Sequence, residues 1–108
     1  MEKKVMDLAT VLANCQAMCN YCFDSCLHEE DVKMMAKCIK LDKECAEVCS
    51  VTLSLLASNS SFTMDILQVC ARICSECAQE CKKHNNEHCQ ECTKVCEHCA
   101  EACKAYAA

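Results

Sequence analysis

Residues 70–81 have the sequence CARICSECAQEC, in which the cysteines follow one another at intervals of four, three and four residues. The same 4-3-4 spacing occurs in CQAMCNYCFDSC at residues 15–26. Because an α-helix turns once in about 3.6 residues, positions three or four apart lie on one face of the helix. Both segments therefore predict helices that carry a stripe of thiols where a helical bundle normally places leucine.

The remaining cysteines extend this pattern over most of the chain, which has 16 cysteines among 108 residues. Residues 89–103 carry cysteines at intervals of 3-4-3-4, and a sparser 7-4 set lies within residues 38–49. Together they predict a core built largely from thiols. We treat all of them as candidate metal ligands: Cys15, Cys19, Cys22, Cys26, Cys38, Cys45, Cys49, Cys70, Cys74, Cys77, Cys81, Cys89, Cys92, Cys96, Cys99 and Cys103.

The composition favours helices and argues against several classes of function. The chain contains no glycine and no proline, which loops and hairpins usually require, so we expect long helices with short connections. A formal charge of -5 without a clustered basic patch gives no support for nucleic-acid binding. No segment approaches the roughly 20 apolar residues of a transmembrane helix, so we expect no membrane association.

The amino terminus also bears on the cellular compartment. Asp7, Thr10 and Asn14 interrupt any apolar segment that could serve as a signal peptide, so we expect a cytoplasmic protein. In a reducing compartment, so many cysteines are more often free thiols or metal ligands than disulfides.

Breaks in the cysteine pattern divide the chain into helices. Polar segments at 27–31, 59–61 and 83–86 interrupt it, and we expect helices near 3–27, 31–57, 62–83 and 86–106. Ser61 and Asn86 are the expected N-caps of the last two helices. Short connections favour antiparallel neighbours, so the predicted fold is all-α, a single domain over 1–108 with an antiparallel up-down-up-down four-helix bundle and a cysteine-lined core.

Alternating helix direction brings the cysteine-rich halves of the helices to one end of the predicted bundle. We call this end, closed by the connections at 27–31 and 83–86, the mouth. The opposite end is expected to be an apolar plug, in which Leu12, Phe62 and Leu67 are representative residues. The sequence therefore predicts a thiol-lined tube along most of the bundle instead of one compact site.

Several chemistries could use such a core. Cysteine fills less space than leucine, so a purely structural core would contain voids. Two cysteines four apart on one helix suit a disulfide poorly, although bridges between helices remain open under oxidation. Structural zinc and iron–sulfur sites usually take cysteines from turns or loops. Copper(I), a soft ion, prefers thiolate sulfur, and pairs such as Cys15 and Cys19 offer it two ligands.

This pattern resembles that of the bacterial copper storage proteins. The residues that carry the resemblance are the C-x3-C pairs on four successive helices, with C-x3-C-x2-C-x3-C written at 15–26 and 70–81. The resemblance implies binding of multiple copper(I) ions inside the bundle, assembly into homotetramers and membership of the cytosolic branch. The second helix departs from the pattern, since Leu41 and Asp42 follow Cys38 where a partner cysteine would stand.

The mouth carries further candidate ligands. His28, His84 and His88 map to this end as candidate entry residues for copper, although histidines near helix ends are also common as exposed residues. Met34 and Met35 lie at the same end and offer soft thioethers, with core packing as the simpler interpretation. His98 lies off the cysteine stripe, so we expect it to be exposed.

The leading functional prediction is a binding protein that stores and detoxifies cytosolic copper(I) without catalysis. It would exchange copper with a chaperone or a small-molecule copper(I) ligand. Two alternatives remain: a zinc or mixed-metal buffer of the metallothionein type, and a thiol redox protein. A redox protein would need a distinct accessible thiol with a low pKa, and no cysteine in the sequence stands out in this way.

Overall fold

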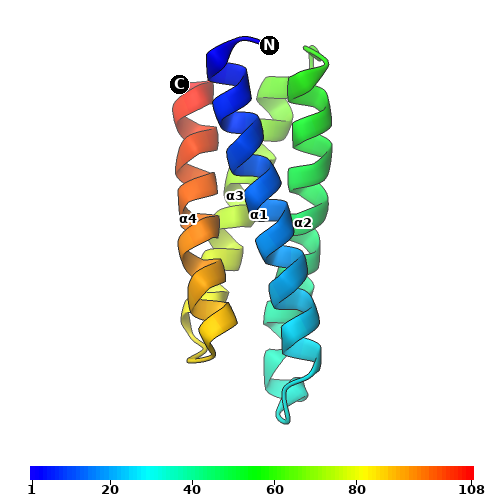
Figure 1. The fold of residues 1–108 in the computed structure, drawn as a ribbon, viewed down its shortest axis with the longest axis vertical. Coiled ribbons are helices and arrows are strands. Elements are labelled where there is room, and N and C mark those ends of the chain that lie inside the picture. Colours follow the sequence, from blue (N-terminus) through cyan, green and yellow to red (C-terminus); the bar gives the residue numbers. More distant parts are fainter.

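A computed structural model describes residues 1–108 as four antiparallel helices (Figure 1). They are α1 (Lys3–Leu27), α2 (Ala36–Ala57), α3 (Thr63–Lys82) and α4 (Glu87–Ala107), and a short 3-10 helix, η1 (Val32–Met35), precedes α2. Each helix packs against its two neighbours, α1 and α3 both contacting α2 and α4. The body measures 44 × 19 × 18 Å, with both termini at one end. The predicted up-down-up-down bundle is confirmed.

The start of α2 differs from the prediction, whereas its end at Ala57 agrees with it. The helix begins at Ala36 instead of residue 31, because η1 forms first with an i→i+3 hydrogen bond of 2.9 Å from the Met34 amide to the Asp31 carbonyl. At the other end, Asn59 adopts a left-handed conformation with φ of 55°. The backbone amide of Asn59 donates a hydrogen bond to the Leu56 carbonyl at 3.2 Å, and that of Ser60 donates to the Leu55 carbonyl at 3.0 Å. Asparagine thus ends the helix in a chain that has no glycine.

The start of α3 corrects two expectations. Ser61 is not the N-cap, since the helix begins at Thr63 and the Ser60 hydroxyl accepts the Phe62 amide at 3.0 Å. Phe62 was expected in the plug, yet it is 65% exposed. Lying just outside the first turn, it projects away from the bundle axis. Asn86 does precede α4 as expected, although its side chain makes no capping hydrogen bond.

The core divides along its length as the sequence predicts. At the end that carries the termini, the buried side chains are aliphatic, among them Leu8, Leu12, Leu56 and Leu67. Burying one such side chain stabilises the fold by about 1.5–3 kcal/mol. All sixteen cysteines are fully buried and continue this core toward the mouth. The aliphatic plug therefore holds the helices together at one end of the bundle, and the thiols fill the core toward the other end.

Candidate metal-binding channel

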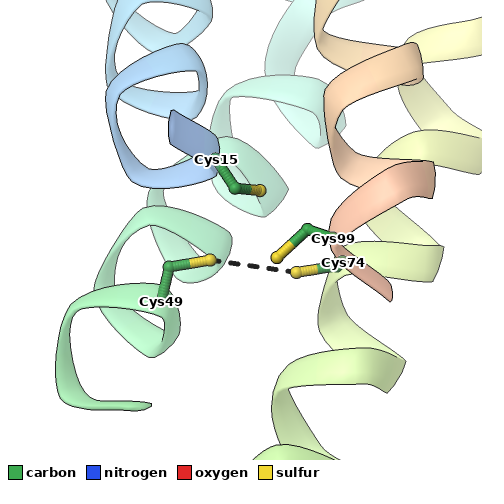
Figure 2. A group of neighbouring side chains, drawn as sticks. All are labelled: Cys15, Cys49, Cys74 and Cys99. Atoms are coloured by element: carbon green, nitrogen blue, oxygen red, sulfur yellow. Dashed lines mark hydrogen bonds between the residues drawn. The ribbon is translucent and has the colours of Figure 1, made fainter. Parts of the chain in front are cut away.

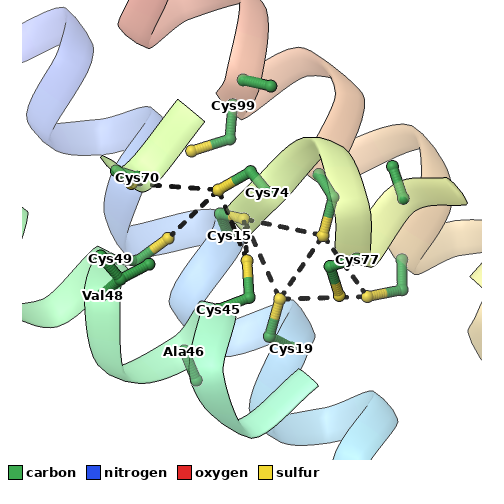
Figure 3. Close-up of a cluster of buried hydrophobic side chains, with 14 of the residues drawn as sticks. Cys15, Cys19, Cys45, Ala46, Val48, Cys49, Cys70, Cys74, Cys77 and Cys99 are labelled. Carbon is green, nitrogen blue, oxygen red and sulfur yellow. Dashed lines mark hydrogen bonds between the residues drawn. The ribbon is translucent and has the colours of Figure 1, made fainter. Parts of the chain in front are cut away.

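Most of the cysteine sulfurs contact another sulfur, and these contacts form a network along the bundle axis. All sixteen cysteines are free thiols, and the sulfurs in direct contact lie 3.4–4.0 Å apart. Contacts join different helices as well as successive turns: Cys15 Sγ lies 3.9 Å from both Cys45 and Cys96. Figure 3 shows this network where α1, α2 and α3 meet. The 4-3-4 stripes of separate helices therefore interlock into a single channel.

Four-membered groups of ligand atoms stack along this channel, with the atoms of each group within 4.8 Å of one another. Consecutive groups share members, so no boundary separates one site from the next. Five of the six groups are, from the mouth inward, Cys22, Cys26, Cys38 and Cys89; Cys22, Asp42, Cys81 and Cys92; Cys19, Cys77, Cys92 and Cys96; Cys15, Cys19, Cys45 and Cys96; and Cys15, Cys49, Cys74 and Cys99. In Figure 2, the innermost of these groups draws one cysteine from each helix, and the side chains point toward one another.

Asp42 belongs to this channel, although it was not among the predicted site residues. Its fully buried carboxyl accepts hydrogen bonds from the thiols of three cysteines on other helices. Cys77 and Cys92 lie 3.3 and 3.5 Å from Oδ1. The spacing already contained the signal, because Cys38, Asp42, Cys45 and Cys49 repeat the 4-3-4 pattern. The second helix is therefore not missing a position of its stripe, because a carboxyl group stands where the other helices have a thiol.

Burial controls the protonation of this channel. It raises the pKa of Asp42 to about 11, and nearby sulfurs, chiefly Cys92 and Cys77, act in the same direction. Asp42 therefore keeps its proton at neutral pH in the metal-free protein. Burial also raises the pKa of the Cys26 thiol, and it raises the pKa of Cys89 to about 12.

Deeper in the channel, hydrogen bonds between thiols shift their pKa values in opposite directions. The hydrogen bond between Cys15 and Cys19 lowers the pKa of Cys15 and raises that of Cys19, because the donor holds its proton while stabilising charge on the acceptor. Two adjacent thiolates would repel each other, so such a pair gives up one proton far more easily than two. The metal-free channel is therefore mainly neutral and apolar in character.

At the mouth, the structure brings only one of the three predicted histidines to the thiols. His88 Nδ1 lies 3.5 Å from the sulfurs of Cys22 and Cys89 and 3.9 Å from that of Cys26. On the opposite edge of the ring, Nε2 lies 3.2 Å from Oε1 of Glu29. His88 thus stands between the outermost thiol group and the α1–α2 connection.

The other candidate entry residues lie outside the thiol network. His28 is 74% exposed, and its Nδ1 lies 2.8 Å from the Asp24 carbonyl oxygen. His84 pairs with Glu80 at 2.9 Å and has no sulfur within hydrogen-bonding distance. Met34 is 74% exposed and Met35 is buried in the core. His98 is exposed, as expected.

None of the four helices combines the length and the apolar character that a bilayer crossing requires.

Comparison with known proteins points in one direction. The profile described as "Copper storage protein" matches residues 1–108. The cysteine-rich protein YhjQ of Bacillus subtilis is 42% identical over 77 residues, which is 71% of each chain. Among solved structures, an apo copper storage protein, CSP3 of B. subtilis, is 39% identical with a TM-score of 0.90, over 95% of this chain and 98% of that one. A cytosolic copper storage protein from Streptomyces lividans, carrying five coppers, is 32% identical with a TM-score of 0.94, covering 97% of this chain and 92% of that one.

Proposed function

This chain belongs to the copper storage protein family, and on that premise we propose that residues 1–108 form one domain that binds and stores multiple copper(I) ions. The observation that carries the proposal is the unbroken stack of thiol groups, in which each group shares sulfurs with the next. A soft ion that accepts two or three thiolate ligands can occupy such a stack repeatedly. The copper(I)-bound structure of BsCsp3, 38% identical with a TM-score of 0.94, supports this proposal.

We propose the sixteen cysteine sulfurs as the copper ligands, with the carboxyl of Asp42 as an oxygen ligand between the outer and inner groups. His88 Nδ1 is the proposed entry ligand because it alone among the histidines faces the thiols. His28, His84, Met34 and Met35 lie at the same end, and the exposed His28 and Met34 are candidates for the first contact with an incoming ion.

Loading follows from the protonation of the channel. Each copper(I) ion replaces protons on the thiols that bind it, so uptake releases protons and weakens as pH falls. The positive charge of each ion offsets part of the charge on the thiolates that bind it, which reduces the repulsion that keeps the metal-free thiols protonated. Sixteen sulfurs form eight unshared pairs. Sulfurs that bridge two ions raise the capacity above eight, and the close sulfur contacts favour such bridging.

The alternatives fit the structure less well. A thiol redox protein needs an accessible cysteine, whereas every cysteine here is fully buried. A zinc or mixed-metal buffer of the metallothionein type needs four ligands around each zinc ion. Groups of sulfurs that share members suit copper(I) better, because it accepts two or three thiolates. We therefore propose sequestration without catalysis. The Streptomyces relative is described as cytosolic, and by analogy we propose a cytosolic location. From the family resemblance we also propose a homotetramer and exchange of copper with a chaperone or a small-molecule ligand.

Anaerobic titration with copper(I) in competition with a chromogenic chelator tests the storage function. We expect more than eight tightly bound equivalents per chain and little competition from zinc. Cys74→Ser removes one sulfur at nearly constant volume and should lower the capacity, whereas the exposed control Glu76→Gln should leave it unchanged. Saturation at one or two ions, with zinc bound as tightly as copper, would contradict the proposal.

A further inference from the structure

Glu29 links the α1–α2 connection to the start of α4 at the mouth. It follows α1 in the α1–α2 connection, and its backbone amide donates to the Cys26 carbonyl at 3.3 Å. That bond ties Glu29 to a residue of the outermost thiol group. Its side chain then crosses to the first turn of α4, where Oε1 lies 3.2 Å from His88 Nε2. The backbone that ends one helix thus places a carboxylate behind the histidine of another.

This contact determines which edge of the His88 ring can accept an ion. A neutral imidazole carries its proton on one nitrogen and a free lone pair on the other. A carboxylate only accepts hydrogen bonds, so Nε2 holds the proton and donates it to Glu29. Nδ1, which faces the sulfurs of Cys22 and Cys89 at 3.5 Å, is left with its lone pair toward the channel. The opposite tautomer would point an N–H group at the thiols.

A second glutamate–histidine pair lies at the same end of the bundle, but it differs from the Glu29–His88 pair in its surroundings. His84 pairs with Glu80 at 2.9 Å, but its ring meets no sulfur. Glu80 is also shared with Lys37 and Lys83, at 3.9 and 3.5 Å. The Glu29 carboxylate, by contrast, pairs with His88 alone. Only at His88 does a carboxylate on one side of the ring coincide with thiols on the other.

We propose that Glu29 is a positioning residue, which holds His88 in the Nε2–H tautomer with Nδ1 directed at the outer thiol group and thereby sets the rate of copper(I) entry. This inference rests on the proposed storage function for its kinetic part. Carboxylates behind metal-binding histidines act in the same physical way, and losing one typically costs on the order of 10- to 100-fold in affinity or activity. Glu29 contributes no ligand, so the total capacity is independent of it.

The structural part is tested on the metal-free protein by nitrogen-15 NMR of labelled histidines at pH 7.5. The wild type should show His88 with Nε2 protonated and Nδ1 bare. Glu29→Ala should shift His88 toward a mixture of tautomers, whereas Glu30→Ala, the exposed neighbouring control, should not. An unchanged His88 tautomer in Glu29→Ala overturns the proposal. This measurement involves no copper, so its result tests the role of Glu29 even if the protein does not store copper.

The kinetic part uses stopped-flow transfer of copper(I) from a chelator. Glu29→Ala should slow the first phase by about tenfold or more at unchanged capacity. In a His88→Ala background, the same substitution should have no further effect, because Glu29 acts through that ring. Equal slowing in both backgrounds would show that Glu29 acts by another route and would overturn the proposal. A wild type that takes up no copper would instead refute the storage function.

Discussion

Replacing Asp42 by asparagine tests whether ionising a carboxyl group buried in the channel destabilises the fold. Asp42 is fully buried, and its carboxyl is surrounded by thiols that donate to it, at 3.3 Å for Cys77 and 3.5 Å for Cys92. Asparagine has nearly the same shape and keeps the oxygen acceptor, but it does not ionise. Comparing the stability of Asp42→Asn with that of the wild type therefore separates the effect of ionising Asp42 from the effect of its packing.

The magnitude follows from the pKa of Asp42, which burial raises from 3.8 to about 11. Above pH 3.8 the unfolded chain loses this proton while the folded chain keeps it. The stability contribution is therefore fully present below pH 3.8 and declines as pH rises toward 11. Between pH 4 and pH 7 the decline amounts to about 4 kcal/mol, at about 1.36 kcal/mol per pH unit. Asp42→Asn removes this decline and should be the more stable protein at pH 7.

Urea unfolding of the metal-free proteins, under reductant and without oxygen, measures the difference. The series runs from pH 4.5 to pH 7, below the range in which thiols of the unfolded chain ionise. The gap between Asp42→Asn and the wild type should widen steadily with pH. Asp7→Asn, at an exposed surface pair with Lys3, is the control and should change stability by less than about 1 kcal/mol. Parallel pH profiles for Asp42→Asn and the wild type would refute the assignment of a protonated Asp42.

Three further predictions concern the plug and the metal-free fold. Leu67→Ala, at a fully buried plug position, should cost about 2–5 kcal/mol in urea unfolding yet leave the copper capacity intact, since no sulfur is lost. Phe62→Ser, by contrast, should change stability by at most about 0.5 kcal/mol because that ring is 65% exposed; a loss above 2 kcal/mol would place the ring in the plug after all. The metal-free, reduced protein should give a strongly helical circular dichroism spectrum, because neutral thiols pack as apolar groups; a disordered spectrum would contradict this.

The fold was largely predictable because one periodicity specifies it. Intervals of three and four place the cysteines on helix faces, and short connections then bring the faces together. Local backbone geometry at the connections was not predictable in the same way. The 3-10 turn before Ala36 and the left-handed Asn59 depend on how the chain enters and leaves packed helices. The exposure of Phe62 has the same origin, since shifting the helix start by one residue turns that ring outward.

The site was predictable for sulfur and less so for the other ligands. Asp42 occupies a stripe position that the spacing identifies, but an acidic residue among thiols looks like a gap when only cysteines are counted. The three histidines near the mouth cannot be ranked from sequence, because all of them lie close to helix ends. His88 is distinguished by contacts from other elements, namely Cys22 of α1 and Glu29 of the following connection. Such contacts become visible only once the helices are assembled.

The most direct test of copper storage in the channel is the crystal structure of the copper-loaded protein, with anomalous diffraction data collected on both sides of the copper absorption edge. We expect a chain of copper peaks along the bundle axis, bonded to the sulfurs of all four helices from Cys26 at the mouth to Cys103 near the plug. Copper confined to surface histidines and methionines, with the sixteen sulfurs free of metal, would contradict it.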